Sequence, residues 1–187
     1  NTPTYEMQAA MTVNGNLTIT DGVLDTGADV DLTVEGATFI ATNGTLTCNA
    51  STCQFGAVGY TAGSGLYCEG SSPGATFNGG TGTHTYSSLI LAADSNVDFT
   101  PTTGSATITG ESNAGRALYI GNGTVEGTVG AGSIIVATAT DTVELRCNDA
   151  TLGNLTFTPA SGTPTHELKS NGINIAGNLT INAGATI

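Results

Sequence analysis

The chain has 187 residues, of which 10% are charged and 27 are glycine, and its formal net charge at pH 7 is −12. Three Lys and Arg residues are too few to neutralise phosphates, so we expect no nucleic-acid partner. No apolar run approaches the length of a transmembrane helix, and we expect no membrane insertion.

Residues 1–13 precede a repeat that organises the rest of the chain. An open solenoid end exposes apolar side chains and unpaired strand edges, which terminal segments usually cover. We therefore expect these residues to form an N-terminal cap or an incomplete first rung. A partner-binding arm is the alternative.

Residues 14–187 carry a regular repeat whose period, about 23 residues, indicates a solenoid. One glycine begins each unit, at Gly15, Gly36, Gly56, Gly80, Gly104, Gly127, Gly153 and Gly177. In the clearest unit, strands are expected at 16–20, 23–26 and 30–34, separated by glycine turns. We predict an all-β, single-stranded parallel β-helix of about eight rungs, with roughly 20–26 residues and three strands per rung. We expect this β-helix to continue or to be capped beyond residue 187.

A leucine in the second half of each unit is the clearest inward position. The next residue is mostly polar or amphipathic and the one after it mostly small or apolar, an alternation typical of a strand with one buried face. The predicted core column consists of Leu24, Leu46, Leu66, Leu89, Leu118, Leu145 and Leu168.

The four cysteines, Cys48, Cys53, Cys68 and Cys147, form no C-x-x-C pair, so no zinc or redox motif is predicted. Cys48 and Cys68 occupy equivalent positions of consecutive units. Stacked strands would place their Cα atoms about 4.8 Å apart, which suits a disulfide and hence an oxidising, extracellular location. A column of buried free thiols explains the same spacing equally well.

Alternating oxygen ligands at Asp94, Asn96 and Asp98 make this segment a candidate calcium site. Strand alternation alone also places such residues on one wet face, so we predict no metal and no cofactor.

No catalytic residues are predicted. The only histidines, His84 and His166, have no recognisable nucleophile beside them, and no carboxylate pair stands out for glycoside hydrolysis. The cations Arg116, Arg146 and Lys169 are dispersed along the sequence, unlike the basic residues that β-helix lyases use beside calcium. A polysaccharide-active enzyme is the alternative.

The Gly-Asn-Leu-Thr-Ile and Asp-Gly-Val-Leu-Asp-Thr-Gly units, together with residues 77–86, resemble the Thr/Gly-rich β-solenoid repeats of phage structural proteins and bacterial surface proteins. The resemblance covers about residues 13–187 and carries no functional residues. It implies a fibre, tailspike or capsid-decorating component, often trimeric, or a bacterial adhesin or extracellular filament.

We therefore expect a non-enzymatic structural protein on the exterior of a virion, a rigid fibre or decoration element that serves stabilisation or attachment. Its expected partners are other structural proteins of a virion or cell surface, further copies of itself in a trimer or filament, and surface glycans. The alternatives are a bacterial surface adhesin or extracellular filament subunit, and a glycan-binding or glycan-depolymerising tailspike-like β-helix. An ice-binding solenoid is disfavoured, because Thr18 and Thr20 do not recur as a regular ladder.

Overall fold

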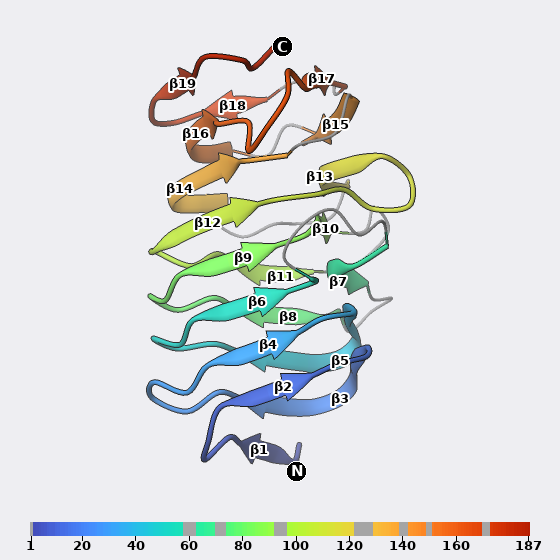
Figure 1. Cartoon of the computed structure of the whole chain (residues 1–187). Helices are drawn as coiled ribbons and strands as arrows, with labels where there is room; N and C mark the ends of the chain where they lie inside the picture. Colours follow the sequence, from blue (N-terminus) through green and yellow to red (C-terminus); the bar gives the residue numbers. More distant parts are fainter. Residues whose placement is uncertain are drawn as a thin grey trace.

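The computed structural model describes residues 2–57, 63–69, 74–91, 97–121, 129–138, 142–148, 151–169 and 173–187. The described residues form strands and loops and contain no helix, so none of them belongs to a helix that could span a membrane. The strands stack into an elongated coil, with the two ends of the chain at opposite ends of the stack (Figure 1).

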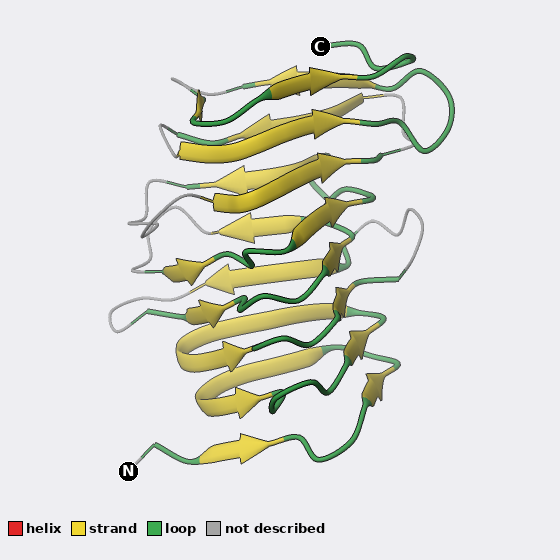
Figure 2. Ribbon diagram, turned by 90° about the vertical axis from the view of Figure 1, so that its left-hand side faces the viewer, coloured by secondary structure: helices red, strands yellow, loops and turns green. Residues whose placement is uncertain are grey.

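The strands form two parallel sheets (Figure 2). Sheet A contains, in order, β1 (Thr4–Glu6), β3 (Leu17–Asp25), β5 (Ala37–Thr47), β7 (Gly65–Glu69), β10 (Leu89–Leu91), β13 (Arg116–Ile120), β15 (Thr142–Arg146) and β17 (Thr165–Leu168), and β8 (Thr76–Asn78) and β11 (Asp98–Thr100) branch from β5. Sheet B contains β2 (Met11–Val13), β4 (Leu32–Val34), β6 (Cys53–Phe55), β9 (His84–Tyr86), β12 (Ser105–Ile108), β14 (Val129–Val136), β16 (Thr151–Phe157) and β18 (Asn174–Ile175), and β19 (Leu179–Ile181) also pairs with β16. The protein is thus all-β and built from parallel sheets, as in a parallel β-solenoid.

The core lies between the sheets and is filled by alternate strand positions. In β6 the outer two residues are buried and the middle one is half-buried, as a period-two pattern requires. One column of sheet B runs in register through Val34, Phe55, Tyr86, Ile108, Val136 and Phe157, each at most 1% exposed. Each such side chain contributes about 1.5–3 kcal/mol through burial, so stacking provides the core that a globular centre would otherwise supply.

Strand β5 turns a corner and serves two neighbours. Its first half pairs with β7 and its second half, Thr45–Thr47, pairs with β8. The bend lies at Thr42, which has a φ of 53°. A Cβ on Gly44 would overlap the carbonyl oxygen of Ile19, so only glycine fits this close approach between rungs.

The predicted leucine column is split in two by this corner. Leu24 is the register partner of Leu46 in the next rung, and Leu46 in turn pairs with Phe77. Leu66 pairs instead with Thr38, on the first half of β5. From Leu66 the register continues through Leu89, Leu118, Leu145 and Leu168. The prediction that Leu46 and Leu66 are neighbours in one column is therefore wrong.

Burial along the leucine positions also varies. Leu46, Leu66, Leu118 and Leu145 are fully buried and Leu89 nearly so, while Leu24 is partly buried against the core. Leu168 is 45% exposed, contrary to its predicted inward position.

The glycine period fails at the same corner because one rung is longer than any that the glycines predict. Cys53 has His84 as its register partner in the next rung of sheet B, and the chain between them contains both β7 and β8. As a result, copies of the repeated motif that begins Gly-Asn-Leu-Thr lie in different sheets. The unit at 15–19 lies in sheet A, whereas its equivalents at 153–157 and 177–181 lie in sheet B.

The same motif fits both sheets because its chemistry is local. Asn16 Oδ1 accepts a hydrogen bond from the Ala37 amide in the next rung, at 2.9 Å. Asn154 Oδ1 accepts the equivalent bond from the Asn178 amide, also at 2.9 Å. The motif therefore marks a link between successive rungs and not a particular face of the coil.

The N-terminal segment belongs to the sheets. Strand β1 pairs with β3 and strand β2 pairs with β4. Met7, between them, is 8% exposed and packs into the core.

Candidate functional site

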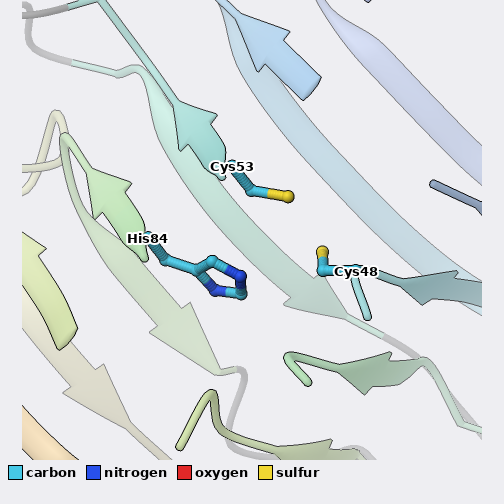
Figure 3. A group of neighbouring side chains, drawn as sticks. All are labelled: Cys48, Cys53 and His84. Atoms are coloured by element: carbon cyan, nitrogen blue, oxygen red, sulfur yellow. The ribbon is translucent and has the colours of Figure 1, made fainter. Parts of the chain in front are cut away.

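Two thiols and an imidazole meet inside the core, at the long rung. Cys53 and His84 face inward from β6 and β9 and are direct register partners. Cys48 comes directly after β5. The chain then makes a tight turn, in which the Ser51 amide donates to the Cys48 carbonyl at 2.9 Å, and this turn places Cys53 beside Cys48. The three side chains point toward one another (Figure 3).

The cluster is compact and closed to solvent. One ligand atom from each of Cys48, Cys53 and His84 lies within 4.8 Å of the other two, and all three residues are 0% exposed. The Nδ1 atom of His84 is hydrogen-bonded to the Tyr86 hydroxyl at 2.9 Å. Nε2, the other ring nitrogen, is buried without a hydrogen-bond partner among the described residues.

Aromatic rings surround the histidine. The rings of Phe55 and Phe77 lie edge-on to His84, with centroids 6.0 and 5.9 Å away. Phe77 in turn stacks on Phe99 at 5.0 Å. These contacts fix the imidazole orientation and keep water away from the two thiols.

The two thiols of the cluster differ in acidity. A hydrogen bond from Cys48, helped by the neighbouring His84 ring, lowers the pKa of Cys53 to about 6 against the opposing effect of burial. The same hydrogen bond, together with burial, raises the pKa of Cys48 well above its ordinary value. Of the two thiols, Cys53 is therefore the more acidic.

The predicted disulfide between Cys48 and Cys68 is absent, and all four cysteines are free. Cys68 pairs in register with Ile40 on the first half of β5, so the corner separates it from Cys48. Burial raises the pKa of Cys68, and it raises that of Cys147 to about 12. The explanation by buried free thiols fits these cysteines.

The candidate calcium segment is only partly described. Asp94 and Asn96 lie outside the described residues, and Asp98 is exposed at the start of β11. The prediction that this candidate segment binds no metal therefore stays a prediction.

The three cations, expected to be dispersed, converge on one acid. Glu144 forms ion pairs with Arg116 Nε at 3.3 Å, Arg146 Nε at 3.0 Å and Lys169 Nζ at 3.7 Å. Lys169 also contacts Glu167 at 2.5 Å. The cations lie about one rung apart along the chain, so stacking brings them onto one outer face.

Beside these cations, an open groove of about 310 Å³ crosses the outer face of sheet A. Phe39 and Tyr67 stack in its wall at 5.2 Å. Arg116 contributes a cation that also lies over the ring of Tyr119, at 4.5 Å from the centroid. Glu69 and Asn113 add polar groups to the lining.

The other sequence candidate, His166, is an isolated buried residue. Its ring nitrogens bond to the Thr138 hydroxyl at 3.1 Å and to the Thr186 carbonyl at 3.3 Å. It thus has both partners that a core histidine needs, and no thiol or acid of the described residues forms a metal-binding group with it.

Comparison of the chain with protein-family models, with curated proteins and with solved structures gave no match.

Proposed function

We propose that this protein is a rigid structural element on the exterior of a virion, of the fibre or decoration type, that serves stabilisation or attachment. The observation that supports the proposal most is the parallel ladder of sheet B, which runs from β2 to β18 with an aromatic and aliphatic column behind it. In such a ladder each rung hydrogen-bonds to the next along the axis, so bending or extension breaks many bonds together.

The proposed rod has about eight rungs with three strands each. At about 4.8 Å per rung it is roughly 40 Å long. The net charge of −12 keeps such rods soluble and separate from one another. Its proposed partners are other structural proteins of a virion or cell surface and further copies in a trimer or filament. A bacterial adhesin or extracellular filament subunit is the alternative placement of the same rod.

Immunogold labelling of the source particles and cells with an antibody to the folded chain tests this proposal. We expect label on the outside of intact virions or, in the alternative, on the outside of intact cells. Label that appears only after lysis would overturn the exterior assignment.

A second function, glycan binding, is supported by the groove on sheet A. Stacked aromatic rings bind the apolar faces of sugars, and neighbouring acid, amide and guanidinium groups suit their hydroxyls. In the groove, Phe39 and Tyr67 provide the rings, while Glu69, Asn113 and Arg116 provide the polar groups. The groove opens to solvent, so a saccharide can reach these groups.

Calorimetric titration with host-surface polysaccharides, paired with an assay for new reducing ends, tests this second function. Tyr67→Ala should weaken binding at least tenfold, whereas Tyr5→Ala, which removes a tyrosine that is 66% exposed on β1, should leave it unchanged. Equal binding by both variants would exclude the groove. Sustained release of reducing ends would instead favour the depolymerising enzyme.

A further inference from the structure

We propose that Cys48, Cys53 and His84 form a buried, structural binding site for a soft metal ion with a filled d shell, copper(I) or zinc. The site would link the corner after β5 to two neighbouring strands of sheet B at the rung where the register changes. It is independent of the proposed exterior function.

The unpartnered histidine nitrogen is the first observation that points to a ligand. Buried polar atoms in native proteins nearly always have a hydrogen-bond partner, and exceptions call for an explanation. His84 Nε2 is buried in an aromatic environment, has no partner in the described part of the chain, and belongs to a ring directed at the two thiols (Figure 3). A metal ion between the three side chains would use this lone pair.

The other ring nitrogen provides the support that metal-binding histidines usually have. Such a histidine donates its second N–H to a neighbouring acceptor, which fixes the tautomer and the ring orientation. Here Nδ1 lies 2.9 Å from the Tyr86 hydroxyl, and in the tautomer in which Nδ1–H donates to that hydroxyl, Nε2 is unprotonated and available as a ligand. Tyr86 is itself 1% exposed, so this contact is shielded from water.

The donor set selects the class of metal. Thiolate and imidazole ligands favour copper(I) and zinc over calcium and magnesium, which take oxygen ligands. Zinc with two thiolates and a neutral imidazole is electrically neutral, as is copper(I) with one thiolate, one thiol and the imidazole, so either ion avoids a buried net charge. Loading releases to solvent the thiol protons that the metal displaces.

The coordination number favours copper(I) over zinc. Structural zinc sites have four protein ligands, whereas the described residues supply three within 4.8 Å. Phe55 and Phe77 close the site on the histidine side. We therefore expect copper(I) to bind more tightly than zinc.

The test uses the full chain, reduced and stripped of metal by a chelator, then loaded anaerobically with copper(I) or with zinc. Elemental analysis after desalting should give one metal equivalent per chain, and the melting temperature should rise with metal concentration, because an ion that binds only the folded state stabilises it. Cys53→Ser and His84→Gln should each lower the affinity at least tenfold. Cys147→Ser is the matched control, a buried free cysteine remote from the cluster, and should bind like the parent.

Tyr86→Phe keeps all three ligands and most of the core volume, and it keeps the proposal testable where a ligand variant fails to fold. Loss of a second-sphere hydrogen bond should weaken metal binding by about 10–100-fold. Uptake of less than a tenth of an equivalent by the folded parent would overturn the proposal. The proposal would also be overturned if the two cysteines form a disulfide in preference to binding metal. Mass mapping would then find the Cys48 and Cys53 peptides joined.

Discussion

Cysteines introduced on the outer surface test the register at the corner of β5. Thr47 lies beside Asn78 in register, and Asn78 Nδ2 donates to Thr47 Oγ1 at 3.3 Å. The sequence period instead places Thr47 beside Tyr67, which the structure pairs with Phe39. Paired strands hold Cα atoms about 4.8 Å apart, within the range that a disulfide spans. The double variant T47C/N78C should therefore oxidise to a disulfide, whereas T47C/Y67C should not.

The gain in stability follows from the loop that the new bridge closes. Thr47 and Asn78 are 31 positions apart, and for a loop of that size the chain-entropy relation gives about 3–4 kcal/mol. Denaturant unfolding with and without reductant measures this difference, and non-reducing peptide mapping identifies the bridge. The four native cysteines are fully buried and should stay out of exchange in the folded protein. Ready bridging of T47C/Y67C, with T47C/N78C left reduced, would refute the register.

Two further substitutions test the inward and outward faces. Leu66→Asp should lower the free energy of unfolding by more than about 3 kcal/mol, because it loses the burial of a leucine and buries a carboxylate. Tyr67→Asp on the outer face should lower it by about 1 kcal/mol. Equal losses in urea unfolding would contradict the assigned faces. Glu144→Gln should cost about 1–2 kcal/mol at low salt, because it leaves three cations together without their shared acid, and the loss should shrink when the salt concentration is raised several-fold. Glu167→Gln, which removes a single surface ion pair, should stay within about 0.5 kcal/mol, and a salt-independent loss in the Glu144 variant would argue against the ion-pair explanation.

The fold class could be predicted from sequence because the period-two alternation and the repeat are properties of every rung. The expected strands at 16–20 and 23–26 fall within or beside β3, and that at 30–34 contains β4. These assignments depend only on local chemistry: glycine and aspartate at turns, and threonine, valine and isoleucine in strands.

Register could not be predicted in the same way, because it depends on the length of each rung. The glycine repeat treats the segment from Gly56 to Gly80 as one unit of ordinary length. In the structure, the residue that lies beside Cys53 in the next rung of sheet B is His84, so this rung is longer than the repeat predicts. A better alignment was present in the sequence. Residues 53–55 (Cys-Gln-Phe) and 84–86 (His-Thr-Tyr) share an inward, outward, inward pattern that ends in an aromatic ring.

The metal-binding group was missed for the same reason. A search for C-x-x-C pairs looks for ligands that are close in sequence, but Cys48 and Cys53 face each other across a corner and His84 arrives one rung later. The expectation that the three cations are dispersed was wrong for a similar reason. Arg116, Arg146 and Lys169 follow one another at intervals of about one rung, and in a solenoid such spacings place side chains side by side.

The pH dependence of stability should report on His166, which lies buried against Phe157 at 4.7 Å. In the neutral ring Nδ1–H donates to the Thr186 carbonyl and Nε2 accepts from the Thr138 hydroxyl, so a second proton at Nε2 would break the latter bond. Burial lowers the pKa of His166, and the bond to Thr186 opposes this only in part.

Because the folded state holds the proton less tightly than the unfolded chain, His166 contributes its full stabilisation above the ordinary histidine pKa of about 6.5 and loses it as the pH falls below that value. The free energy of unfolding should therefore decrease between pH 7.5 and pH 5. His166→Gln should show a smaller decrease, since the remaining histidine, His84, is common to both proteins. Urea unfolding at each pH measures both slopes. An unchanged slope in the variant, or a parent protein that gains stability on acidification, would contradict the neutral, buried state of this imidazole.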